Sequence, residues 1–249
     1  MERLFFIFTV WGWVLSLTTG IALAVDVTSG LVGYWPLDGN AKDSVGGNDG
    51  KKVGGAKWTN NGYLKDAVEL DGSTGLVEVS GFKLTTDTIT AVAWINGWKQ
   101  TDWTGIVVGR GATPFWMGFT DQDTVSYVWN NNSAQTWGWR NGPKIPQEKW
   151  AMTAVAIEPK KATAYIYSDA KLTFEVNAIA HIEQTVENLK FGWDECCGAG
   201  RHFLGIIDEV MIYDRALNED EILKLATSGL AVNPTDKLTT TWGSIKNKF

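Results

Sequence analysis

Short runs of β-branched and aromatic residues, separated by Gly, Asn and Asp, make up most of the sequence from Leu31 onward. Runs of this length and composition are typical of β-strands, and the residues between them are typical of turns. The predicted strands are 31–37, 76–79, 88–95, 105–109, 116–120, 125–129, 150–158, 163–167, 172–177 and 203–213. Because no helical pattern separates these runs, they exclude an α/β fold and predict an all-β protein with two packed antiparallel sheets.

Side chains within these runs alternate with a period close to two, most clearly over 150–157 and 163–167. Alternation places one face of a strand on a core and the other toward solvent or a second layer. The polar segment Glu158-Pro159-Lys160-Lys161 lies between these two runs. Because such a segment favours a turn, the two runs are predicted to form a hairpin.

One helix is predicted near the end of the chain. Asn218 is a suitable N-cap, and Glu221 follows three residues later, as in a capping box. Gly229 has the position of a residue that ends a helix. The apolar stripe of this helix consists of Ile222, Leu225 and Ala226.

The first 24 residues have the pattern of an export signal. Arg3 supplies a positive charge, residues 4–17 form an apolar run, and Ala22-Leu23-Ala24 matches a small-residue cleavage site. The alternative is an uncleaved membrane anchor, but the run breaks at 18–20, before the roughly 20 apolar residues that a span needs. We expect a cleaved signal peptide over 1–24, secretion, one domain over 30–228 and a tail over 229–249.

Three segments stand in a recognisable order along the chain: 30–44 with 46–50, then 67–72 with 76–79 and 89–95, and finally 203–217. Taken together, they resemble the laminin-G-like jelly-roll family of the concanavalin-A-like superfamily. They match its first strand and loop, its next strands and its closing strand. The resemblance implies a two-sheet antiparallel jelly-roll sandwich with one short C-terminal helix, which agrees with the strand pattern.

The same resemblance implies a calcium ion where the first loop meets the closing strand. The loop over 38–50 is rich in the hard oxygen ligands that calcium prefers. The side-chain ligands implied are Asp43, Asp49 and Asp208. The alternative is that the loop residues form turns, that Asp208 or Glu209 pairs with Arg215, and that no ion binds; a Glu209–Arg215 pair is expected in either case.

The net charge of the chain and the spacing of its carboxylates argue against two classes of function, nucleic-acid binding and glycoside hydrolysis. The net charge of −6 and the pI near 5.0 argue against a nucleic-acid partner, and no segment after the signal is apolar for long enough to cross a bilayer. A glycoside hydrolase needs two carboxylates that flank the scissile bond. Hydrolases of this superfamily present them as E-x-D-x-E or E-x-D-x-x-E, which the sequence lacks. We expect no catalytic residues.

Tryptophan is frequent, with 14 residues in the chain. Trp35, Trp94 and Trp150 lie in apolar strands and are expected in the core. A second group lies among polar loop residues, where an indole face can stack on a sugar while neighbours hydrogen-bond its hydroxyls. The candidate ligand-binding residues are Trp137, Trp139, Arg140, Trp193, Trp98 and Trp103. The alternative is that these rings cover the ends of the sandwich.

The two cysteines are adjacent, so they cannot link distant strands. In an oxidising compartment Cys196 and Cys197 are predicted to form a vicinal disulfide; the alternative is two free thiols in a loop. His202 follows them, but adjacent cysteines chelate a zinc ion awkwardly and a fourth ligand is missing.

These observations predict a secreted binding module that recognises carbohydrate or another extracellular polymer, with calcium as a structural ion. Two alternatives stay open: an adhesive or scaffold protein that binds a protein partner, and a glycoside hydrolase on the same fold.

Overall fold

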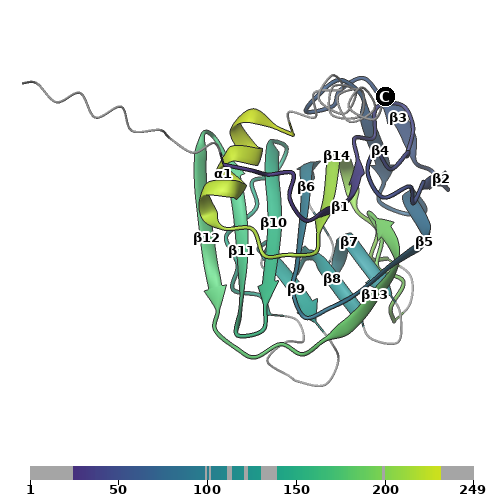
Figure 1. Ribbon diagram of the computed structural model, residues 1–249. Coiled ribbons are helices and arrows are strands. Elements are labelled where there is room, and N and C mark those ends of the chain that lie inside the picture. The colour runs from purple at the N-terminus through teal and green to yellow at the C-terminus, as the bar shows by residue number, and fades with distance from the viewer. Residues whose placement is uncertain are drawn as a thin grey trace, which may run out of the picture.

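The computed structural model describes residues 25–98, 100, 102–110, 114–120, 123–129, 139–197 and 200–230. Within these ranges the chain forms two antiparallel sheets packed face to face and one helix (Figure 1). The predicted all-β jelly-roll sandwich is therefore confirmed. The expected signal peptide, Trp137 and the tail beyond residue 230 lie outside the described residues.

The larger sheet contains eight strands among the described residues, in the spatial order β12-β11-β10-β6-β14-β4-β3, with β1 paired to β14. Their bounds are β1 Leu31–Trp35, β3 Lys57–Thr59, β4 Ala67–Asp71, β6 Ile89–Gly97, β10 Trp150–Glu158, β11 Lys161–Ser168, β12 Lys171–Asn177 and β14 Leu204–Tyr213. The β10–β11 hairpin has the predicted turn, because Glu158 pairs with Lys161.

The smaller sheet contains six strands among the described residues, in the order β2-β5-β13-β7-β8-β9. Their bounds are β2 Lys51–Val53, β5 Leu76–Thr86, β7 Thr104–Arg110, β8 Pro114–Phe119, β9 Val125–Trp129 and β13 Gln184–Phe191. The run β7-β8-β9 forms a meander at one edge of this sheet, and β13 separates it from β5.

The main core lies between the two sheets, where the inward-facing residues of the central strands are buried. Trp35 of β1 is completely buried and contacts Phe82 and Phe191 of the smaller sheet edge-on, at centroid distances of 6.2 and 5.1 Å. Its indole N–H donates to the Asn48 carbonyl at 3.0 Å. Trp35 thus connects the larger sheet, the smaller sheet and the first loop through its ring contacts and its hydrogen bond.

A second apolar cluster covers the outer face of the larger sheet, under α1 (Glu219–Ser228). Asn218 accepts from the Glu221 backbone N–H and Glu221 reciprocates, which is the predicted capping box, and Gly229 ends the helix with a φ of 63°. No helix among the described residues has the length and apolar character to span a bilayer.

Strands β2, β3 and β13 were not predicted from the sequence, whereas β4 corresponds to the segment 67–72 that the resemblance assigns to a strand. The β13 segment carries four charged or amide side chains, and Asn188 interrupts its pairing with β5 at a positive φ of 53°. Interrupted alternation hides a strand from a period-two pattern. This omission matters because β13 leads directly into the loop that builds the site described below.

Candidate functional site

The outer face of the smaller sheet carries a compact aromatic and aliphatic cluster. Val108 of β7, Trp116 of β8 and Val128 of β9 are cross-strand neighbours, and Trp103 packs on them from the segment before β7. The rings of Trp103 and Trp116 lie 5.5 Å apart at a tilt of 51°. Trp103 is half-buried and has a positive φ of 63°, a conformation that is uncommon outside glycine and often found at functional sites.

A loop that follows β13 folds back along β7 and brings polar groups to this cluster. The Gly192 N–H donates to the Ile106 carbonyl at 2.9 Å, and the Gly105 N–H donates to the Arg201 carbonyl at 3.4 Å. Gly192 has a φ of 89°, and a Cβ at this position would collide with Leu70. Glycine is required here, and the chain after this turn brings Asp194, Cys196, Cys197 and Arg201 to the outer face.

Asp194 holds two arginines on this face. Arg110 donates from Nε and Nη2 to Oδ1 at 3.0 and 2.6 Å, and Arg201 donates from Nη1 to Oδ2 at 2.8 Å. The Cys196 backbone N–H adds a bond to Oδ1 at 3.0 Å. The Asp194 side chain is 1% exposed, and each arginine side chain is 20% exposed. We call Arg110, Asp194 and Arg201 the arginine clamp.

Two guanidinium groups lie over the Trp103 ring. The Cζ atoms of Arg140 and Arg201 are 5.0 and 5.4 Å from its centroid, within the range of cation–π contacts. Trp103 therefore positions arginines as well as presenting an aromatic surface.

A small hollow of about 40 Å³ lies between the clamp and the aromatic cluster. Its lining consists of Trp103, Arg110, Pro114, Trp116, Val128, Asp194, Cys196, Cys197 and Arg201. We call these residues together the outer-face site. The site combines apolar walls with fixed cationic donors, which is the composition of a ligand-recognition surface.

The structure brings only some of the candidate binding residues together. Trp103 and Arg140 meet at the outer-face site. Trp98 lines a separate open cleft of about 260 Å³ with Leu204 and Glu69.

Two other candidate tryptophans pack against neighbouring side chains. Trp193 stacks on His202, with ring centroids 5.1 Å apart, and Trp139 packs against the main core beside Tyr127. The candidate residues therefore do not form one surface.

Sequence reasoning missed most of the outer-face site. Trp116 lies in the apolar run Pro114–Phe119, where a buried strand was the natural interpretation. The alternation of inward Phe115 and Met117 with outward Trp116 is a signal that could have identified it. Asp194 and Arg201 lie in one loop, but Arg110 is 84 residues before Asp194, so only the β7–β13 pairing brings it to them.

The adjacent cysteines form one wall of the hollow. The structure joins Cys196 to Cys197, with Cα atoms 3.8 Å apart, and Cys197 has a positive φ of 62°. Formation of this disulfide in the exported protein stays a prediction. The cysteine pair and the arginine clamp line the same hollow. The conformation of the loop that contains the cysteines therefore affects the geometry of the site.

The carboxylates expected to bind calcium have separate hydrogen-bonding roles. Asp43 accepts backbone N–H bonds from Tyr34, Val45, Gly46 and Asn48, all at 3.0 Å, and the Asp43 N–H donates to Asp49. Burial acts to raise the pKa of Asp43, but these bonds outweigh it and lower the pKa below its ordinary value. These bonds order the first loop around the Asp43 carboxylate.

Asp208 is fully buried on the outer face of the larger sheet and accepts from the backbone N–H groups of Leu64 and Glu209. Burial raises the pKa of Asp208 to about 8 and that of Glu209 to about 7. No three acidic, histidine or cysteine side chains among the described residues gather as a metal site. Asp43, Asp49 and Asp208 therefore do not meet there as one donor set.

The expected pair between Glu209 and Arg215 is wrong. Glu209 accepts from the Tyr34 hydroxyl at 2.8 Å, whereas Arg215 pairs with Glu221 at 2.7 Å. Glu209 has a positive φ of 52° at an irregularity in β14. A regular strand pattern does not reveal this irregularity. Glu209 therefore contacts Tyr34 and not Arg215, the partner expected from the sequence.

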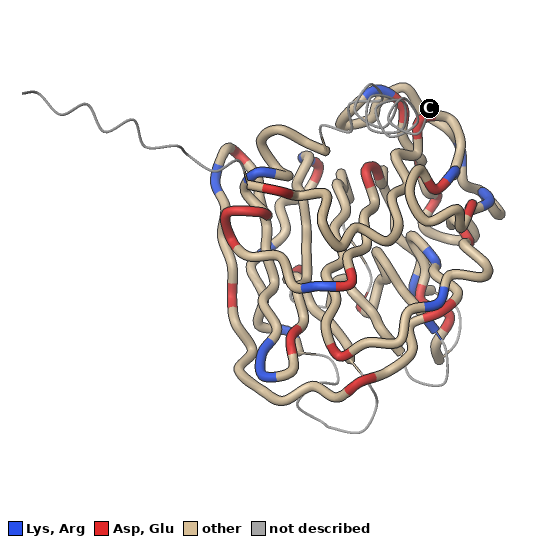
Figure 2. The backbone as a smooth tube through the Cα atoms, viewed as in Figure 1, with Lys and Arg blue, Asp and Glu red and all other residues tan. Residues whose placement is uncertain are grey.

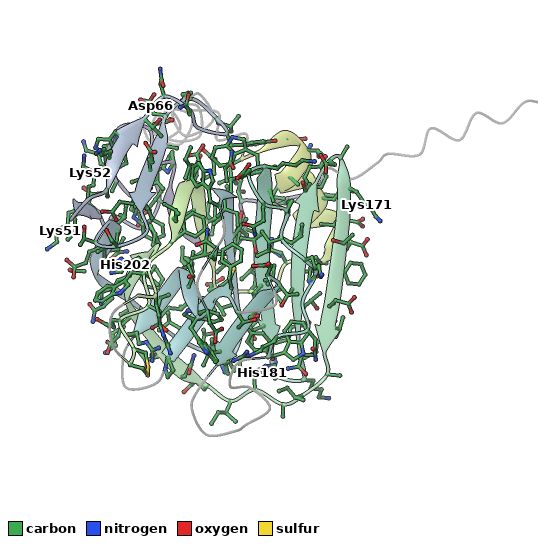
Figure 3. The ribbon with its side chains drawn as sticks, turned by 180° about the vertical axis from the view of Figure 1, so that it is seen from behind. Lys51, Lys52, Asp66, Lys171, His181 and His202 are labelled. Carbon is green, nitrogen blue, oxygen red and sulfur yellow. A yellow bond between two sulfur atoms is a disulfide. The ribbon has the colours of Figure 1, made fainter. Side chains whose placement is uncertain are left out.

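The two histidines lie in different parts of the molecule. Figure 3 labels His202 on the side that carries Lys51 and Lys52, and His181 at the lower end of the sandwich. His181 contacts the Tyr127 hydroxyl at 3.0 Å and the Glu158 carbonyl at 2.8 Å. Burial lowers the pKa of His181, so this side chain is a neutral structural link.

Comparison with known proteins identifies the superfamily of the chain and solved structures with a similar fold. The sequence profile described as the concanavalin A-like lectin/glucanases superfamily matches residues 71–223, more than half of the chain. No curated protein sequence matches it. Domain 4 of AbnA, a GH43 extracellular arabinanase from Geobacillus stearothermophilus solved with arabinotriose, has a TM-score of 0.58 at 19% identity and covers 79% of this chain and 98% of that domain.

Two further solved structures share the fold. The botulinum neurotoxin serotype D/C binding domain has a TM-score of 0.60 at 14% identity, with 84% of this chain and 54% of that chain covered. A Trypanosoma rangeli sialidase solved with sialic acid has a TM-score of 0.57 at 14% identity, with 80% of this chain and 33% of that chain covered. The chain thus spans about half and a third of these two proteins and has a lectin-like fold.

Proposed function

The chain belongs to the concanavalin A-like lectin/glucanases superfamily, and from this premise we propose that it is a secreted module that binds glycans at the outer-face site. The observation that carries the proposal is the arginine clamp beside Trp103 and Trp116. Aromatic rings next to charge-assisted donors suit a ligand that has both apolar faces and polar groups.

Neighbours of the same fold support a carbohydrate partner in general terms. The GH43 arabinanase domain was solved with arabinotriose, and a botulinum neurotoxin binding domain was solved with SialylT. Identities of 19% and 14% relate this chain to them in fold alone. The choice of a glycan ligand therefore rests on the chemistry of the site, because fold by itself does not imply function.

The burial and the ion pairs of the described carboxylates favour a binding protein over a glycosidase. The two with the most strongly raised pKa values, Asp208 and Glu209, are only 0% and 4% exposed. Asp194 is engaged by both arginines. A glycosidase acid and its partner must both reach the scissile bond, and these side chains are positioned to hold the fold and the clamp.

Replacing Trp103 with alanine should weaken glycan binding by at least about tenfold, or about 1.4 kcal/mol. The ring positions Arg140 and Arg201 and contributes its own surface to the site. Binding would first be surveyed on a glycan array, and the affinity for the best glycan would then be measured by calorimetry.

Trp98→Ala is the matched control, because Trp98 is also half-buried but lines the other cleft. It should leave the affinity nearly unchanged. An array with no bound glycan would contradict the proposed function. Equal losses for the two variants would contradict the assignment of the site.

A structural calcium ion stays part of the proposal as a separate prediction. An ion bound only by the folded first loop would stabilise the protein by linkage, so EDTA should lower the melting temperature and added calcium should restore it. Asp49→Ala should remove this response. An unchanged melting temperature in EDTA would show that the hydrogen bonds to Asp43 hold the loop without an ion.

A further inference from the structure

We infer that the outer-face site selects an acidic sugar, whose carboxylate binds in the hollow between Arg110 and Arg201. This inference rests on the proposed glycan-binding function and specifies the ligand class. Four features carry it: the donors left over on the clamp, its charge, the arginines over Trp103, and the size of the hollow.

The clamp arginines are held in place but retain donors. Each guanidinium has five N–H groups, and Asp194 receives bonds from Arg110 Nε and Nη2 and from Arg201 Nη1. Within the described part of the chain, Arg110 Nη1 and Arg201 Nε and Nη2 make no hydrogen bond. Fixed, planar donor groups of this kind match a carboxylate, which accepts two parallel N–H bonds.

The clamp has an excess of positive charge. Two guanidinium groups share one carboxylate, so the three side chains carry a charge of +1 in a protein whose net charge is −6. Each arginine side chain is only 20% exposed. An anion is therefore the ligand that best balances this partly desolvated charge.

The arginines over Trp103 disfavour a neutral sugar. The guanidinium groups of Arg140 and Arg201 already lie over the ring, so a sugar stacking on the face that either one covers would have to displace it. A carboxylate binds a guanidinium group without removing it from the ring. The geometry thus favours recognition through the arginines.

The hollow has the size of a carboxylate rather than a sugar ring. Its volume of about 40 Å³ is far below the roughly 300–1,000 Å³ of clefts that enclose a whole small-molecule ligand. Trp116 also lines it, and the buried Trp116 Nε1–H lacks a partner among the described residues. The sugar ring would lie outside the hollow.

The test compares acids with their methyl esters, which keep the sugar and remove the charge. The probes are trigalacturonic acid and methyl α-N-acetylneuraminate, each as free acid and as ester, together with a sulfated galactose trisaccharide. Calorimetry on the whole protein should show at least about tenfold tighter binding of one acid than of its ester. This preference should shrink at high salt, because salt screens charge.

Arg201→Gln should abolish the preference for acid over ester, and Arg201→Lys should restore part of it, because lysine keeps the charge but loses the planar fork. Lys52→Gln is the matched control, since it also removes one positive charge but lies in β2 at the opposite edge of the sheet. It should keep the full preference. Melting temperatures of all variants would show that they fold.

Four results would overturn the inference. Equal Trp103-dependent binding of acids and esters, or binding of neutral glycans alone, would reject the acidic ligand and leave the proposed function standing. Tighter binding of the sulfated probe than of both acids would replace the carboxylate with a sulfate. No binding to any probe or array glycan would reject the proposed function itself.

Discussion

Asp194→Ala is expected to lower the free energy of unfolding by about 3 kcal/mol and to abolish ligand binding. Removing one partner of a buried ion pair leaves the other charges uncompensated, at a typical cost of about 3–5 kcal/mol. The lower end applies here because Arg110 and Arg201 keep 20% exposure. For a chain of this size, the melting temperature should fall by roughly 6–12 °C.

Two variants test the origin of this loss. Asp194→Asn keeps one acceptor oxygen and should fall between wild type and alanine in melting temperature. Lys51→Ala breaks an ion pair with Glu78 in which the lysine side chain is 68% exposed, and exposed pairs contribute about 0–1 kcal/mol. If Asp194→Ala melts like Lys51→Ala, the clamp is not a buried network.

Trp35→Ala is expected to destabilise the protein by about 3–5 kcal/mol, because truncating a buried aromatic residue leaves a cavity. The side chain has no exposed surface, contacts both sheets, and donates to the Asn48 carbonyl. The corresponding fall in melting temperature is roughly 6–20 °C. Thermal unfolding followed by near-ultraviolet circular dichroism would measure it.

Trp35→Phe is the control, because it keeps a ring in the core and removes the indole N–H. It should recover much of the lost stability. Trp103→Ala provides the opposite pattern, with weakened binding and a small change in melting, since its half-buried ring leaves no enclosed cavity. Equal destabilisation by Trp35→Ala and Trp103→Ala would show that the outer-face tryptophan is structural.

Local signals in the sequence were sufficient for the fold class. The apolar runs, the Glu158–Lys161 turn and the Asn218 capping box each act over a few residues, and the structure reproduces all three. Strands β2 and β3 are only three residues long, and β13 has an irregular register. Such strands are held by pairing with distant neighbours, so their own residues carry a weak signal.

The environments of the loop tryptophans could not be predicted from their neighbours in the sequence. Trp98, Trp103, Trp139 and Trp193 all lie among polar residues in the sequence, yet they go to four different environments. Polarity of the neighbours indicates that a ring is near the surface. It does not indicate which other segment packs beside it.

By itself, the sequence determined the two-sheet architecture, the helix with its cap and the superfamily, because these depend on periodicity and on motifs in chain order. Only the tertiary structure decided the outer-face site. Arg110 ends β7, whereas Asp194 and Arg201 follow β13, and the two strands become neighbours only when the sheet forms. The carboxylate is then buried at the point where both guanidinium groups reach it. Long-range pairing sets that geometry, and no local pattern in the sequence encodes it.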